Sequence, residues 1–93
     1  MIIVSQDKDL ILNFKNINAI GIGNPLENDD GMFKVLASTT SDNEYTLGKY
    51  KTEERAKEVL QEIIKSYRHY RTAECDGYTN VLEETAVFEM PKE

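Results

Sequence analysis

Two side chains in this sequence could act as a nucleophile and a base. Cys75 is the only cysteine and His69 the only histidine, and they stand six residues apart. A reactive thiolate needs direct contact with its base and a third group that orients the base. The sequence supplies no such third group, so we predict no catalytic residues. Because a single cysteine cannot form a disulfide within the chain, the composition favours a reducing compartment, and we expect a cytoplasmic protein.

Residues 24–31, NPLENDDG, form an acidic loop whose oxygen atoms could bind a cation. Asp29 and Asp30 offer hard oxygen ligands of the kind that calcium prefers. The spacing of a calcium-binding loop is not met, because the register set by the glycine places apolar Leu26 at the first ligand position. We therefore predict a solvated loop and no bound cofactor. In the alternative, a metal site would use Asp29, Asp30 and His69.

The longer string at residues 21–31, GIGNPLENDDG, resembles the amino-terminal signature G-x-G-N-x-L-x-x-D-D-G of the hydrogenase maturation peptidases. That resemblance implies a small metal-dependent peptidase with a doubly wound α/β fold, in which a helix follows the string. Here residues 32–45 have the pattern of a strand and a turn, and Phe33 stands where the family has glycine. Glycine, asparagine, proline and aspartate are also ordinary loop residues. We therefore interpret the string as a loop between strands.

The overall charge argues against two classes of partner. The formal net charge is −6 and the isoelectric point about 4.8, so the surface repels phosphate backbones and anionic lipids. The basic residues within 65–71 suit the negative end of a helix dipole instead. The first 14 residues contain neither a basic segment nor a long apolar run, which predicts no signal peptide and no membrane span. We expect no nucleic-acid partner and no membrane partner.

Residues 52–70, TEERAKEVLQEIIKSYRHY, have clear helical periodicity. Thr52 is a suitable N-cap, and Glu53 and Glu54 suit the positive end of the helix dipole. A sheet must cover the apolar stripe of this helix, because an isolated amphipathic helix is only marginally stable in water. The stripe recurs in steps of three and four residues, at Ala56, Val59, Leu60, Ile63, Ile64 and Tyr67.

Most of the remaining segments alternate apolar and other residues, as strands do. In residues 10–14, for example, Leu12 lies on one face, and Ile11 and Asn13 lie on the other. The sequence predicts an α+β fold in a single domain over residues 1–93, with an antiparallel sheet of about five to six strands packed on one long helix (β-β-β-β-β-α-β). The last strand either returns to the sheet edge or pairs with another protomer. The predicted strands span residues 2–5, 10–14, 19–23, 32–38, 44–50 and a segment within 81–90.

Surplus aromatic residues and a strand with two partly apolar faces, at residues 32–38, indicate a binding surface. Tyrosine and phenylalanine are favoured at interfaces because they bury a large area, and tyrosine keeps a polar tip. We predict a non-catalytic binding or assembly module that self-associates as a homo-oligomer, with another protein as the alternative partner. The candidate interface residues are Met32, Leu36, Tyr45, Tyr70, Tyr78 and Phe88.

Residues 47–63, LGKYKTEERAKEVLQEI, resemble the L-G-x-Y-x-[ST]-x-x-R-A-x-x-V-L-x-x-[IL] segment of small uncharacterised proteins of Gram-positive bacteria and their mobile elements. The turn at residues 5–8 and the Met-Pro pair at 90–91 also resemble that family, although Lys8 replaces its usual glycine. The resemblance implies a bacterial protein and a type of fold. It implies no activity.

Two other functions stay open as alternatives to the assembly module. The small metal-dependent peptidase predicts a tight divalent-metal site, which calorimetry with Ni²⁺ or Zn²⁺ would detect. An acidic mobile-element regulator that mimics nucleic acid would need a continuous acidic strip. In that alternative Glu54, Glu58 and Glu62 would line up with the acidic loop on the exposed side of the helix.

Overall fold

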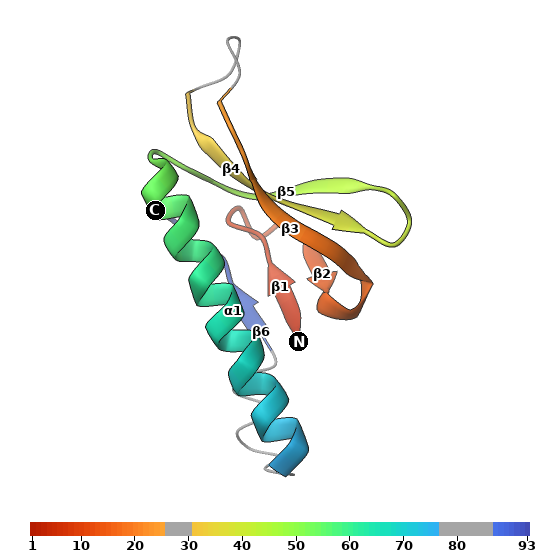
Figure 1. The fold of residues 1–93 in the computed structure, drawn as a ribbon. Coiled ribbons are helices and arrows are strands. Elements are labelled where there is room, and N and C mark those ends of the chain that lie inside the picture. Colours follow the sequence, from red (N-terminus) through yellow and green to blue (C-terminus); the bar gives the residue numbers. More distant parts are fainter. Residues whose placement is uncertain (26–30, 77–86) are drawn as a thin grey trace.

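The computed structural model describes residues 1–25, 31–76 and 87–93, with helical side chains described as far as residue 71. Within these residues the fold is α+β, and the predicted order β-β-β-β-β-α-β is confirmed (Figure 1). A short 3-10 helix, η1, separates the second and third strands. The elements are β1 (Ile2–Val4), β2 (Ile11–Asn13), η1 (Phe14–Asn16), β3 (Ile17–Gly23), β4 (Phe33–Thr39), β5 (Glu44–Tyr50), α1 (Glu53–Asp76) and β6 (Val87–Glu89).

The expected single sheet is not confirmed, because the described strands form two sheets of three strands each. One sheet has the order β2-β1-β6 and the other the order β3-β4-β5. The 3-10 turn explains the separation. The side chain of Asn13 accepts a hydrogen bond from the Lys15 backbone N–H at 3.0 Å, which fixes a tight turn directly after β2. The chain then enters β3 in the other sheet.

The small β2-β1-β6 sheet is mixed. β1 and β2 form an antiparallel hairpin, with Ile3 opposite Leu12. β6 pairs with β1 in the parallel direction, with Ile3 opposite Phe88. The last strand thus pairs within its own chain. Its direction is parallel to β1, whereas the sequence predicted an antiparallel sheet. One further hydrogen bond, from the Met90 N–H to the Val4 carbonyl at 3.0 Å, continues this pairing past the end of β6.

The helix begins as the sequence predicts and ends later. The Thr52 hydroxyl accepts a hydrogen bond from the Arg55 N–H at 3.1 Å, which is the N-cap contact. α1 continues to Asp76, six residues beyond the predicted end. The apolar stripe stops near Tyr70, so periodicity gave no signal for the last turns. In Figure 1 these turns extend past both sheets.

One hydrophobic core lies between the two sheets and the helix. Its members come from β1, β4, β5, α1 and the two chain termini. Among the described residues, no helix combines the length and the apolar character needed to cross a membrane. The buried apolar residues are Met1, Ile3, Val35, Ala37, Leu47, Tyr50, Ala56, Val59, Ile63 and Met90.

Candidate functional site

The residues that could do chemistry do not form a site in the part of the chain that is described. His69 is exposed on α1. Asp29 and Asp30 lie outside the described residues, as does the side chain of Cys75. Across residues 1–25, 31–71 and 87–93, no group of three histidine, cysteine, aspartate or glutamate side chains is placed to hold a metal ion.

The predicted interface residues are spread over several elements. Leu36 lies on β4 and packs against Gly23, where an added Cβ would approach the Leu36 Cδ1 to 2.9 Å. Phe88 and Tyr70 both pack against the core. Tyr45 is half-buried on β5, and Met32, just before β4, is half-buried beside a cavity. Tyr78 lies outside the described residues.

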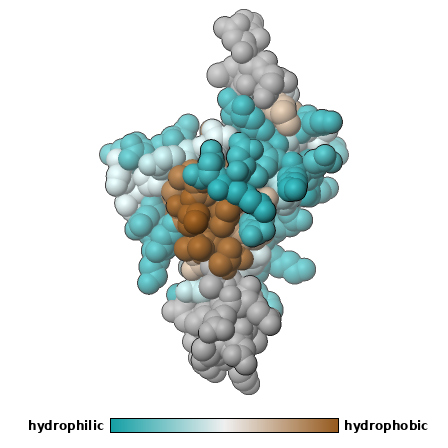
Figure 2. All heavy atoms as spheres, turned by 180° about the vertical axis from the view of Figure 1, so that it is seen from behind, coloured by the Kyte–Doolittle hydropathy of each residue, from teal (hydrophilic) through white to brown (hydrophobic). Residues whose placement is uncertain are grey.

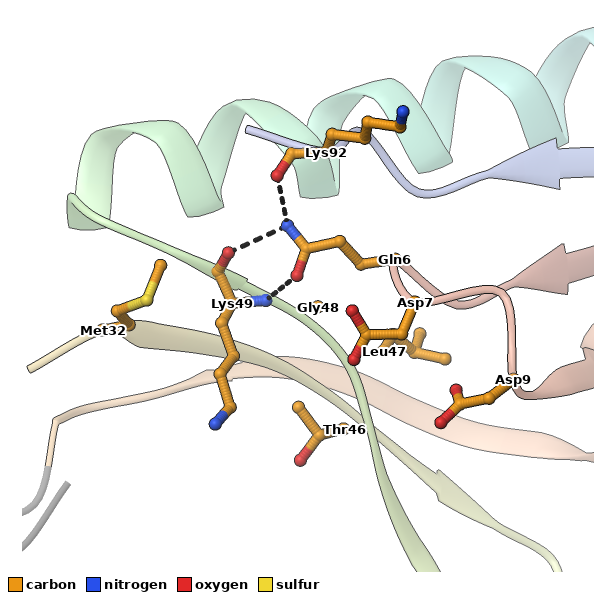
Figure 3. A pocket seen from close by; sticks show the side chains of 9 residues that line it. All are labelled: Gln6, Asp7, Asp9, Met32, Thr46, Leu47, Gly48, Lys49 and Lys92. Atoms are coloured by element: carbon orange, nitrogen blue, oxygen red, sulfur yellow. Dashed lines mark hydrogen bonds between the residues drawn. The ribbon is translucent and has the colours of Figure 1, made fainter. Parts of the chain in front are cut away.

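A polar junction joins the C-terminal segment to the rest of the molecule, and Gln6 is its centre (Figure 3). The Gln6 side-chain amide donates hydrogen bonds to the carbonyl oxygens of Lys49 at 3.0 Å and of Lys92 at 2.7 Å. Its oxygen accepts a hydrogen bond from the Lys49 backbone N–H at 2.8 Å. One side chain from the β1–β2 turn therefore ties β5 and the C-terminus together.

Two further side chains hold the same terminal segment. The Tyr50 hydroxyl donates a hydrogen bond to the Pro91 carbonyl at 2.8 Å. The Arg55 Nε donates one to the Glu93 carbonyl at 2.8 Å. Burial raises the pKa of Tyr50 to about 12; nearby Arg55 acts in the opposite direction, and Glu62 adds to the increase. The hydroxyl thus stays protonated and keeps its role as a donor.

A polar cavity of about 600 Å³ lies beside this junction. In Figure 3 the side chains of Asp7 and Asp9 stand on one side of it, and that of Lys49 stands on the other. Asp9 already accepts a hydrogen bond from the Ser5 hydroxyl at 2.9 Å. The amide of Gln6 is committed to backbone groups. The hydrogen bonds of Gln6 and Asp9 join parts of the fold, which supports a structural role for these two side chains.

A second cavity, of about 480 Å³, is an apolar groove between β3 and α1. Phe14 and Tyr67 line it, with stacked rings whose centroids are 4.3 Å apart. Ile17, Ile20 and Ile64 also line this groove. Ile64 is 42% exposed although it belongs to the helical stripe.

The most exposed apolar feature among the described residues is one face of the β2-β1-β6 sheet. Figure 2 shows the side of the molecule that is turned away in Figure 1, where apolar residues gather over this sheet, with polar residues above and beside them. Ile11 is 62% exposed and Val87 is 46% exposed, whereas Ile2 and Val4 between them are half-buried. Side chains alternate along a strand, so Asn13 at the end of β2 and Glu89 at the end of β6 also lie on this face. We call it the outer face; its six residues are Ile2, Val4, Ile11, Asn13, Val87 and Glu89.

The set of predicted interface residues contains none of the six residues of the outer face. The alternation in residues 10–14 already placed Ile11 and Asn13 together, opposite the side chains that pack on the core. No comparable pattern in the sequence indicated the parallel pairing of β6 with β1. That pairing adds Val87 to the face.

Two of the three glutamates of the alternative acidic strip, Glu58 and Glu62, have a cation beside them. Arg55 lies between the two, with its Nη1 at 3.0 Å from Glu58 and at 3.8 Å from Glu62. Lys57 pairs with Glu53 at 3.4 Å. Cations and carboxylates therefore alternate on this side of α1, as on a solvated helix face.

Comparison with known proteins places the chain in no family: no protein-family model, no curated protein and no solved structure matches it. The described features therefore define a class by architecture alone, a small α+β domain of two three-stranded sheets and one helix.

Proposed function

We propose that this protein is a non-catalytic assembly module that self-associates through the outer face of the β2-β1-β6 sheet. The observation that carries the proposal is the exposure of Ile11 and Val87 on either side of Ile2 and Val4. Four of the six positions on this face are β-branched aliphatic residues. A contiguous exposed apolar area with a polar rim is characteristic of protein interaction sites.

The exposed apolar side chains of this face gain free energy when a second molecule covers them. Burying apolar surface stabilises an association by roughly 25 cal/mol per Å². On this face only Glu89 carries a charge, so a formal net charge of −6 for the whole chain does not concentrate at the contact. A second copy therefore covers the apolar residues without confining many like charges.

The size of the face sets the expected strength of the association. Each strand contributes three residues in register, and two from each strand point outward. Such a face lies at the small end of specific interfaces, where complexes are weak or transient. We expect a dimer with a Kd of roughly tens of micromolar.

Sedimentation equilibrium between about 10 µM and 1 mM tests the proposal, because that range brackets the expected Kd. The wild-type chain is expected to shift from monomer to dimer. The Ile11→Glu variant is expected to stay monomeric, since it places a carboxylate at an apolar position that the contact would cover.

Ile64→Glu is the matched control, because Ile64 is also an exposed isoleucine but lies in the groove on α1. It should dimerise like the wild type. A wild-type chain that is monomeric throughout the range rules the proposal out. If only Ile64→Glu is monomeric, the contact lies in the groove and not on the outer face.

A further inference from the structure

The six residues of the outer face form two rows of three across the strands β2, β1 and β6. The register places Asn13 opposite Ile2 and Ile2 opposite Val87, which gives the first row. The second row consists of Ile11, Val4 and Glu89 in the same strand order. The two polar residues, Asn13 and Glu89, therefore occupy diagonally opposite corners, and Ile11 and Val87 occupy the other two.

This pattern limits how a second copy can lie on the face. In a symmetric face-to-face dimer the two-fold axis lies in the plane of the contact. An axis along the strands would set Glu89 against the partner's Ile11, and an axis across the strands would set Glu89 against the partner's Val87. Both bury a carboxylate against aliphatic groups, which is costly.

Two diagonal axes remain. The axis that runs through the polar corners sets Glu89 against the partner's Glu89, so that like charges meet. The axis that runs from Ile11 towards Val87 sets Asn13 against the partner's Glu89, twice by symmetry. It also sets Ile11 and Val87 against the same two residues of the partner, so that apolar groups meet apolar groups.

We propose that the self-association takes this last form, a two-fold dimer in which Asn13 of one copy donates to the carboxylate of the partner's Glu89. The inference rests on the proposed function and adds its orientation. The axis runs at roughly 45° to the strands, so the two sheets cross at about a right angle, which is one of the two common modes of sheet packing.

The two polar groups have the bonding capacity that the contact requires. The Asn13 oxygen accepts from the Lys15 N–H at 3.0 Å, which leaves the amide nitrogen of Asn13 as a donor. Within the described residues, the Glu89 carboxylate makes no hydrogen bond and no ion pair. A neutral donor to a carboxylate is a charge-assisted hydrogen bond, stronger than one between neutral groups.

A double-variant cycle on the dimer Kd tests the orientation. Asn13→Asp keeps an oxygen for the Lys15 N–H and so preserves the turn. In the proposed dimer, however, it sets the new carboxylate against the partner's Glu89 at both symmetric contacts. The Kd should rise roughly tenfold or more, because the repulsion occurs twice in each dimer. Adding Glu89→Lys to Asn13→Asp should return the Kd to within about threefold of the wild type, since each corner then holds an attractive pair.

Asn16→Asp is the charge-matched control, because Asn16 is exposed on η1 and is not one of the six residues of the face. It should leave the Kd unchanged within about twofold, as expected for an isolated surface charge. If Ile11→Glu abolishes the dimer but the Asn13 and Glu89 substitutions act independently, self-association stands and the proposed orientation is overturned. If the wild-type chain does not dimerise, both are overturned.

Discussion

Both faces of the β2-β1-β6 sheet carry isoleucine, and the two faces have opposite surroundings. On the inner face Ile3 has no exposed surface, and Leu12 and Phe88 pack around the same core. On the outer face Ile11 is 62% exposed. Burial against the core accounts for the inner isoleucine. The outer one gains little from folding, so its place on a contiguous apolar face suggests a role after folding.

The largest expected difference between the two faces is in folding stability. Ile3→Ala removes a fully buried side chain from the middle of β1 and should lower the free energy of unfolding by about 3 kcal/mol. Ile11→Ala should lower it by less than about 0.5 kcal/mol in dilute solution, because most of that side chain is already in water. Urea unfolding at low micromolar concentration measures both values. Equal losses for the two variants would mean that the outer face is covered within the monomer.

An alkaline titration tests the polar junction that holds the C-terminus beside the inner face. The folded pKa of Tyr50 is about 12, above the ordinary tyrosine value of 10.0, so the unfolded chain loses this proton first. The contribution is fully present below pH 10 and is lost as the pH rises towards 12, by roughly 2.5 kcal/mol at most.

Unfolding free energies at pH 9 and above, compared between the wild type and Tyr50→Phe, isolate this contribution. The wild type should show the steeper loss of stability, because the variant has no proton to release at this position. Parallel curves for the two proteins would contradict a buried, protonated hydroxyl at Tyr50.

Removing the centre of the same junction should have a slightly smaller effect. Gln6→Ala leaves the Lys49 N–H without its side-chain acceptor and deletes the donor to the Lys92 carbonyl. We expect a loss of about 2 kcal/mol in the free energy of unfolding. Gln61→Ala is the control, because Gln61 is exposed on α1, and it should change stability by less than about 0.5 kcal/mol. A loss as small as that of the control would show that the junction does not stabilise the fold.

Local sequence patterns predicted most of the elements of this fold. The alternation in residues 10–14 and 44–50 and the helical stripe after Thr52 each follow from the period of one element. The N-cap was also predicted, because a hydroxyl before an acidic first turn is a local signal. The end of α1 was missed because the apolar periodicity of the sequence stops near Tyr70.

The arrangement of those elements was much less predictable. The separation into two sheets depends on the tight turn after Asn13, and the parallel position of β6 depends on contacts with Gln6 and Tyr50, far away in the sequence. The candidate site was hard to predict for the same reason. Ile11 could be assigned to an uncovered face from alternation, but its neighbour Val87 comes from a strand whose partner no local pattern identifies.

The most direct test of the outer face as the contact surface is a concentration series of amide NMR spectra from about 10 µM to 1 mM, the range set by the expected affinity. Self-association through this face predicts shifts that change with concentration for residues of β1, β2 and β6, with little change along β3 and α1. Spectra that do not change with concentration, or changes confined to the groove between β3 and α1, would contradict the proposal.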